Sequence, residues 1–167
     1  NDMYSEKAKS LEFKHSQHWL SVEEQFIVGE DLWKEYFKFT IVRNPWDRLV
    51  SQYFGHVINE VTELSFNEYL IKSFVKKEYH DFKRFIEPSM HWITDDNNNL
   101  LVDYIGKFET LQDDFDAICD QIGIDRRTLP QNGKSKKEHY RTYYSDYTAE
   151  LVHDKFKCDI EEFGYEF

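Results

Sequence analysis

The chain has 167 residues, a net charge of −11 and an aromatic content of 17 %. This length corresponds to about one domain with a sizeable core, and the aromatic content excludes a disordered segment. The negative charge argues against a general nucleic-acid-binding protein, but a local group of basic residues can still bind one small polyanion. Candidates for such a group are Arg43, Arg48, Lys83, Arg84, Lys134, Lys136, Lys137 and Arg141.

The cysteines and the apolar runs bear on the compartment. Cys119 and Cys158 are the only cysteines, which indicates no disulfide scaffold and slightly favours a reducing compartment, so we expect a cytoplasmic protein. No apolar run reaches the roughly 18 residues of a membrane-spanning helix. Because the first residue is Asn1 and not methionine, we expect the natural N-terminus to lie further upstream.

Short elements are expected before residue 37. Residues 1–10 are polar and indicate a frayed helix or a tail, whereas the alternation of apolar and charged residues over 11–15 predicts a short strand. A capping box opens a predicted helix over 21–29. An acidic cap then opens a shorter helix over 31–36, which leads into the next element.

Residues 37–54 carry the clearest pattern in the chain. An apolar run rich in β-branched and aromatic residues predicts a buried strand over 37–42. Asn44 is a good N-cap, Pro45 suits the first helical position, and Asp47 lies in the first turn, where the helix dipole favours an anion. A helix with one apolar face should therefore follow the strand. That face consists of Trp46, Leu49, Val50, Tyr53 and Phe54.

This strand, turn and helix also place two polar side chains. Arg43 ends the predicted strand, and Ser51 lies one to two turns into the helix, on the side of Asp47. The carboxyl edge of a sheet is where α/β proteins bind phosphorylated ligands. The guanidinium and the hydroxyl therefore predict a phosphate site, although an ordinary strand-to-helix turn with a paired arginine is the simpler alternative.

The middle of the chain has a weaker pattern. Residues 56–64 indicate a loop or a helix extension, and a capping box then opens a helix over 65–74. Residues 82–96 are bulky without a clear period, and 95–99 form a surface turn of the Asx type. These segments predict little about function by themselves.

The last third alternates again between strand and helix. A strand is predicted over 100–105 and a helix over 110–122, which Gly123 ends. A basic polar loop covers 130–137, and a final helix with one apolar face is expected over 145–163.

The segment 37–54 resembles the part of sulfotransferases that grips the 3′-phosphate of 3′-phosphoadenosine 5′-phosphosulfate (PAPS). In that family a strand is followed by Arg-Asn/Asp-Pro and by a Ser eight residues after the Arg, the positions of Arg43 and Ser51 here. The longer pattern is most similar to that of the Golgi carbohydrate sulfotransferases and their bacterial relatives. The resemblance to the family is also strong over 102–111 and 140–167. The resemblance implies a single domain over 1–167 with a P-loop-like α/β fold, a parallel sheet in a three-layer α/β/α arrangement.

The resemblance also implies roles for further residues. Phe108 would contact the adenine, and the loop containing Lys134, Ser135 and Lys136 would close over the adenine and the 3′-phosphate. His91 lies in the region that covers the acceptor in relatives. The implied reaction transfers the sulfuryl group of PAPS, the co-substrate, to a hydroxyl of a glycan or small alcohol, without a metal.

Sulfuryl transfer to a hydroxyl needs a base that takes the acceptor proton. In sulfotransferases a histidine before the Arg-Asn-Pro strand often does this, and His15 matches that location, with His18 as the alternative. Both could instead be surface histidines at a helix start. A metal site of these two histidines has little support, since no third ligand lies nearby.

A phosphate-cradling loop is missing from this sequence. Sulfotransferases hold the 5′-phosphosulfate with a lysine and backbone amides of their first strand-loop-helix, but no Gly-x-x-x-x-Gly-Lys or Lys-x-Gly-Thr segment occurs here. We therefore expect that unit to lie outside this chain, which alone should be a poor catalyst. The alternatives are a pseudoenzyme that binds an adenosine bisphosphate without transferring anything, and an adenylate-type kinase relative, against which Arg43 and Ser51 argue.

Overall fold

The structure is a computed structural model that describes residues 21–57, 63–76, 86–130 and 138–167. In chain order these residues form α2 (Ser21–Val28), α3 (Glu30–Glu35), β1 (Phe39–Val42), α4 (Pro45–Gln52), η2 (Tyr53–Val57), α6 (Phe66–Ile71), η3 (Lys72–Lys76), α7 (Met90–Ile93), β2 (Tyr104–Lys107), η5 (Phe108–Thr110), α8 (Leu111–Ile122), η6 (Tyr140–Tyr143), α9 (Asp146–Lys155) and α10 (Lys157–Phe163). None of the described helices is long and apolar enough to cross a membrane.

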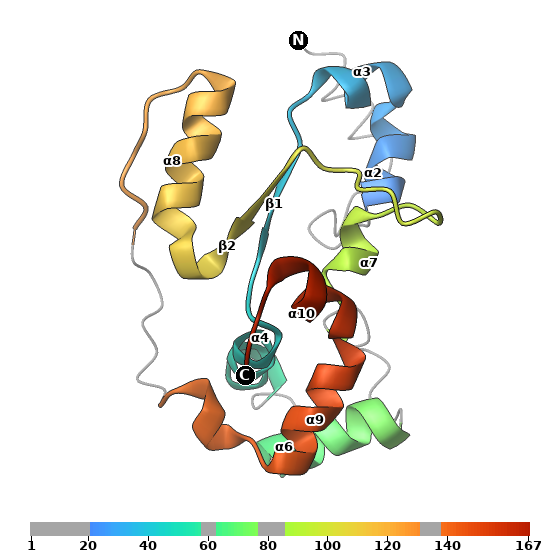
Figure 1. The fold of residues 1–167 in the computed structure, drawn as a ribbon, viewed down its shortest axis with the longest axis vertical. Helices are drawn as coiled ribbons and strands as arrows, with labels where there is room; N and C mark the ends of the chain where they lie inside the picture. The colour runs from blue at the N-terminus through green and yellow to red at the C-terminus, as the bar shows by residue number, and fades with distance from the viewer. Residues whose placement is uncertain (1–20, 58–62, 77–85, 131–137) are drawn as a thin grey trace.

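Strands β1 and β2 pair in parallel, with Phe39 opposite Tyr104 and Val42 opposite Lys107. Helix α8 lies beside β2, and α4, α9 and α10 gather below the carboxyl ends of the strands (Figure 1). Parallel strands joined through helices confirm the expected α/β class. The three-layer arrangement stays a prediction, because the described residues form one two-stranded sheet.

The turn between β1 and α4 forms as its sequence predicts. The Asn44 side chain accepts hydrogen bonds from the amides of Trp46 (3.0 Å) and Asp47 (3.3 Å), and Pro45 occupies the first helical position. These bonds satisfy amides that have no partner inside the helix. The π-helical turn η2 continues α4 directly to Val57, so the helix predicted up to residue 54 is present and slightly longer.

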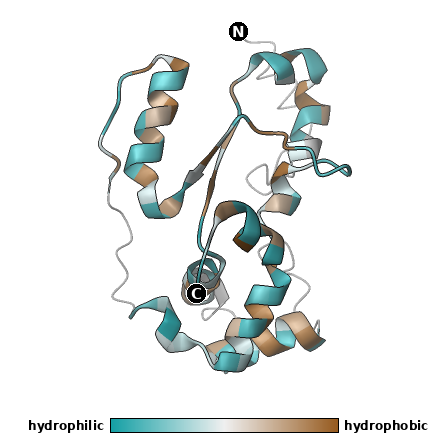
Figure 2. Cartoon of the chain, viewed as in Figure 1, coloured by the Kyte–Doolittle hydropathy of each residue, from teal (hydrophilic) through white to brown (hydrophobic). Residues whose placement is uncertain are grey.

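The core lies between α4, η2, α6, α9 and the C-terminal residues. Trp46 is 2 % exposed, its Nε1 donates to the Ala149 carbonyl (3.0 Å), and its own carbonyl accepts from the Tyr144 hydroxyl (2.9 Å). The buried residues of α9, Thr148 and Val152, lie four positions apart, as expected of a helix with one buried face, and Figure 2 shows a mixed hydropathy along α9. The buried apolar residues of this core are Val42, Trp46, Leu49, Val50, Tyr53, Phe66, Tyr69, Leu70, Ile86, Ile93, Val152, Phe156, Phe163 and Tyr165.

The second strand lies further along the chain than its sequence predicts. We expected it over 100–105, but it spans Tyr104–Lys107. Leu100 instead forms an isolated antiparallel bridge with Thr94, across the predicted turn at Asp95. Gly106 was expected to follow the strand, but it pairs with Ile41 inside it.

The ends of the remaining helices match the sequence prediction, but one helix predicted as continuous is divided in the structure. The capping box expected at Ser65 is present, Ser145 begins α9 with a capping box as well, and Gly123 ends α8 in the left-handed conformation (φ 74°). The single helix predicted over 145–163 is divided at Phe156, whose backbone leaves helical geometry. No glycine or proline stands there, so the sequence carried no signal for the break.

Candidate functional site

The register of the two strands places Arg43 beside Phe108. Val42 pairs with Lys107, so Arg43 and Phe108 are the first residues beyond the carboxyl ends of β1 and β2. The Arg43 guanidinium carbon lies 4.2 Å from the centroid of the Phe108 ring, a cation–π contact. Two residues proposed from separate motifs, one for a phosphate and one for adenine, are therefore neighbours.

Asp47 holds the same guanidinium from the first turn of α4. Its Oδ2 accepts from Arg43 Nε (2.8 Å) and lies 2.7 Å from Arg43 Nη2. The side chains of Arg43 and Asp47 are 24 % and 32 % exposed, and Phe108 is 45 % exposed. A ligand in solution can therefore reach this group of three residues, which we call the Arg43 cluster.

Glu109 ties the turn below the Arg43 cluster to the C-terminal residues. One of its carboxylate oxygens accepts from the Asn44 amide (2.7 Å), and the other accepts from the Tyr165 hydroxyl (3.3 Å). The Asn44 side chain in turn donates to the Glu166 carbonyl (3.0 Å). Burial, followed by the neighbouring Glu109 carboxylate, raises the pKa of Tyr165, which therefore stays a neutral donor. No pattern in the sequence indicated a role for Glu109.

Ser51, the expected second contact to the 3′-phosphate, lies near the end of α4 and is half-buried. It follows Arg43 by eight residues, of which most are in one continuous helix. Its pairing with Arg43 across a phosphate stays a prediction.

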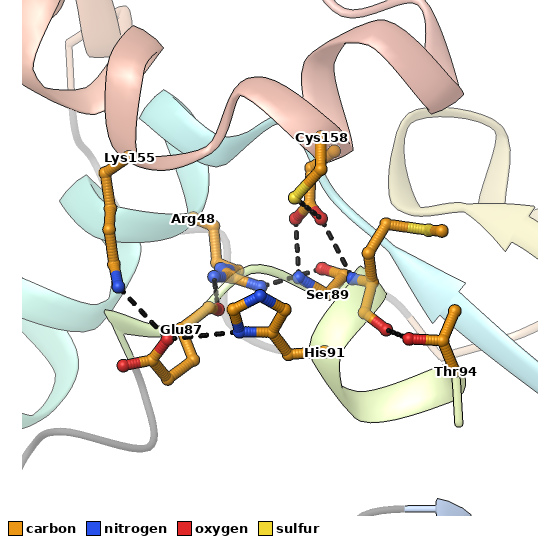
Figure 3. Close-up of polar contacts among 9 residues, drawn as sticks. Arg48, Glu87, Ser89, His91, Thr94, Lys155 and Cys158 are labelled. Carbon is orange, nitrogen blue, oxygen red and sulfur yellow. Dashed lines mark hydrogen bonds and ion pairs between the residues drawn. The ribbon is translucent and has the colours of Figure 1, made fainter. Parts of the chain in front are cut away.

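Arg48 is engaged with the segment before α7. Its Nη1 donates to the Ser89 hydroxyl (2.8 Å) and its Nη2 to the Glu87 carbonyl (2.5 Å), as Figure 3 shows. Its guanidinium also lies 5.0 Å from the centroid of the Phe156 ring. Burial lowers the pKa of Arg48, although nearby acidic groups, Asp159 first, act in the opposite direction. This arginine therefore fixes the fold around α4 and is not part of an exposed basic group.

His91, the candidate for the acceptor region, lies on α7 at the edge of the same contacts (Figure 3). Its Nδ1 is 3.3 Å from a Glu87 oxygen, which also accepts from Lys155 Nζ (3.0 Å), and its side chain is 61 % exposed. The imidazole is thus accessible, while the carboxylate beside it is held from α9. Its role toward an acceptor stays a prediction.

Five predicted site residues lie outside the described residues: the candidate bases His15 and His18, and the loop residues Lys134, Ser135 and Lys136. Their roles stay predictions. Within the described part of the chain, no three His, Cys, Asp or Glu residues are grouped as a metal site would require.

Comparison with known proteins identifies the family. Residues 2–166 match the model of the sulfotransferase family, which is nearly the whole chain. The chain belongs to the sulfotransferase family. The family expected from Arg43, Ser51 and their surroundings is therefore confirmed.

Similar sulfotransferases occur among vertebrate proteins. Human carbohydrate sulfotransferase 10 is 26 % identical over 170 residues, which cover 80 % of this chain and 48 % of the human protein. The protein of that name from Gallus gallus is 26 % identical over 167 residues, covering 78 % of this chain and 47 % of its own length. This sulfotransferase chain thus spans about half the length of these relatives.

An archaeal protein is also similar. An uncharacterized protein of Archaeoglobus fulgidus is 26 % identical over 115 residues, covering 68 % of this chain and 90 % of the archaeal one. No solved structure matches the chain significantly.

Proposed function

We propose that this chain provides the nucleotide-binding part of a PAPS-dependent sulfotransferase that acts on a hydroxyl of a glycan or a small alcohol. One observation carries the proposal: the Arg43 guanidinium lies 4.2 Å from the Phe108 ring, beyond the carboxyl ends of two parallel strands. A cation for a phosphate and an exposed ring for a base are the two groups that a phosphorylated adenosine needs. Membership of the family supports sulfuryl transfer as the reaction.

In this proposal Arg43 and Ser51 bind the 3′-phosphate and Phe108 contacts the adenine. The loop containing Lys134, Ser135 and Lys136 closes over the nucleotide. Carbohydrate sulfotransferase 10, by its name, acts on a carbohydrate, and its similarity supports a glycan acceptor.

The reaction would be an in-line displacement at sulfur. The acceptor oxygen forms the new bond to sulfur while the bond from sulfur to the bridging phosphate oxygen breaks. His15, or His18 in its place, takes the acceptor proton, and 3′,5′-adenosine bisphosphate leaves with the electron pair of the broken bond. His91 would lie beside the bound acceptor. The rest of the three-layer sheet, with a loop for the 5′-phosphosulfate, would complete the enzyme.

Calorimetry with 3′,5′-adenosine bisphosphate tests the donor site. Hydrogen bonds to charged groups contribute about 1.5–3 kcal/mol, so Arg43→Ala should weaken binding by at least about tenfold. Arg126→Ala is the matched control. This exposed arginine lies beyond the end of α8 and pairs with Asp120 of that helix, so its replacement should leave the affinity unchanged. Equal affinities of wild type and Arg43→Ala would remove Arg43 from the site.

Transfer itself needs a second measurement. Wild-type protein should move sulfate from PAPS to a carbohydrate acceptor when the complete protein is assayed. Bisphosphate binding that depends on Arg43, without transfer to any of a panel of glycans and alcohols, would instead identify a non-catalytic nucleotide-binding domain.

A further inference from the structure

Asp47 contacts one particular edge of the Arg43 guanidinium. A guanidinium presents its N–H groups on two usable edges, a side edge of Nε with Nη2 and an end edge of Nη1 with Nη2. The Asp47 carboxylate takes the side edge, with Oδ2 at 2.8 Å from Nε and 2.7 Å from Nη2. The end edge is not used by any other group within the described residues.

The Phe108 ring restricts the orientation of the Arg43 guanidinium from a second side. The centroid of the ring lies 4.2 Å from the guanidinium carbon, so the ring restricts movement of the guanidinium on that side. Asp47 is itself anchored, because it belongs to the first turn of α4 behind the Asn44 cap. A carboxylate on one edge and a nearby ring therefore restrict the orientations of a long, flexible side chain.

We propose that Asp47 is a positioning residue that presents the end edge of Arg43 to the 3′-phosphate of the nucleotide. This inference rests on the proposed function. It concerns how the site binds, since Asp47 itself would not touch the ligand. A phosphate can take two parallel hydrogen bonds from an end edge, so the contact needs no displacement of the carboxylate.

Two effects of Asp47 on a bound phosphate oppose each other. Its negative charge repels the anion, but at 32 % exposure and ordinary salt much of that repulsion is screened by solvent. Its hold on Arg43 orders the guanidinium before the ligand arrives, which saves the ordering cost at binding. Because solvent screens the charge repulsion but not the ordering of the guanidinium, the ordering effect is the larger.

The test measures calorimetric affinities of Asp47→Ala and Asp47→Asn for 3′,5′-adenosine bisphosphate and for 5′-AMP, which lacks the 3′-phosphate. Asp47→Ala should weaken bisphosphate binding about fivefold, and Asp47→Asn less, since its amide oxygen can still accept from Nε. Binding of 5′-AMP should not change. Loss of a merely structural carboxylate at a helix start would weaken both ligands together.

Two controls make the result specific to Arg43. Asp113→Ala removes another carboxylate from the first turn of a helix, α8, and should change neither affinity. In an Arg43→Ala background, Asp47→Ala should have no further effect on the bisphosphate, because the residue through which it acts is gone. Asp47→Asn keeps the test available if the alanine variant does not fold.

The outcomes separate this inference from the proposed function. If Arg43→Ala weakens the bisphosphate but Asp47→Ala leaves its affinity unchanged or raises it, Asp47 is not a positioning residue and the donor site stands. If Arg43→Ala has no effect, or the wild type binds no bisphosphate, the proposed donor site fails and this inference fails with it.

Discussion

Replacing Asp159 by alanine tests what holds the segment that carries His91 against Arg48 of α4. Asp159 is 1 % exposed on α10, and its carboxylate accepts from the amides of Ser89 (2.6 Å) and Met90 (2.9 Å) at the start of α7. The nearby Arg48 guanidinium binds the same segment through the Glu87 carbonyl and the Ser89 hydroxyl. A buried anion thus satisfies two amides and balances a neighbouring cation.

The expected loss of stability follows from the groups that the substitution leaves without a partner. Each hydrogen bond to a charged group contributes about 1.5–3 kcal/mol, so the loss of two such bonds costs at least about 3 kcal/mol, and the Arg48 guanidinium also loses a favourable negative charge nearby. We therefore expect Asp159→Ala to lower the free energy of unfolding by about 3–5 kcal/mol. A protein of this size has about 5–15 kcal/mol in total, so the loss is large. Asp159→Asn keeps one acceptor and should cost less.

Urea unfolding followed by circular dichroism measures the effect. Asp154→Ala is the matched control, because that aspartate lies on the neighbouring helix α9 with its side chain 75 % exposed, and its removal should cost less than about 0.5 kcal/mol. Equal unfolding midpoints for Asp159→Ala and Asp154→Ala would refute the reasoning that a buried carboxylate holds α7 and Arg48 in place.

Two further predictions concern the strand and the core. A Cβ added at Gly106 would lie 2.7 Å from Ile41 Cδ1 and 2.9 Å from Asp114 Cβ, so Gly106→Ala should lower stability by about 1–3 kcal/mol in urea unfolding. Gly55→Ala, where an added Cβ would meet no atom within 4 Å beyond its chain neighbours and its own helix backbone, should be close to neutral. Burial raises the pKa of Tyr69 to about 12, so its contribution to stability is complete below pH 10 and is lost as the pH rises through 12. Tyr69→Phe should reduce the alkaline loss of stability, and an unchanged alkaline unfolding curve would contradict this.

Local chemistry made some elements predictable from the sequence. The turn at Asn44 needs only an N-cap side chain, a proline at the first helical position and an apolar face beyond them, and all lie within one short segment. The same holds for the capping box at Ser65 and for Gly123, whose positive φ (74°) ends α8. In each case the residues that decide the structure are neighbours in the chain.

The position of β2 could not be read from its own residues. The apolar run starting at Leu100 has the stronger strand pattern, yet pairing begins at Tyr104. Asp103 marks that boundary, because its carboxylate accepts from the Lys38 amide (2.8 Å) just before the strands pair. Gly106 lies inside the strand because Ile41 and the first turn of α8 approach it closely. Both constraints come from distant residues, which periodicity cannot reveal.

In the candidate site, too, single residues could be predicted from local patterns, but the contacts between them could not. Arg43 and Phe108 were found because each belongs to a short family pattern, but their contact depends on the register of β1 and β2. Asp47 was seen only as a charge suited to a helix start. Its hold on Arg43 is also an i to i+4 contact, a spacing that could have indicated the pair in advance.

The strand ends and the C-terminal residues form one unit. Glu109 binds both the Asn44 amide and the Tyr165 hydroxyl, and Lys107 Nζ donates to the Phe163 carbonyl (2.5 Å). The turn that begins α4, and with it Asp47, is therefore held by residues more than a hundred positions later in the chain. Because burial and Glu109 keep the Tyr165 hydroxyl protonated, this connection persists through the neutral pH range. The orientation of Arg43 thus depends on the end of the chain as well as on its own helix.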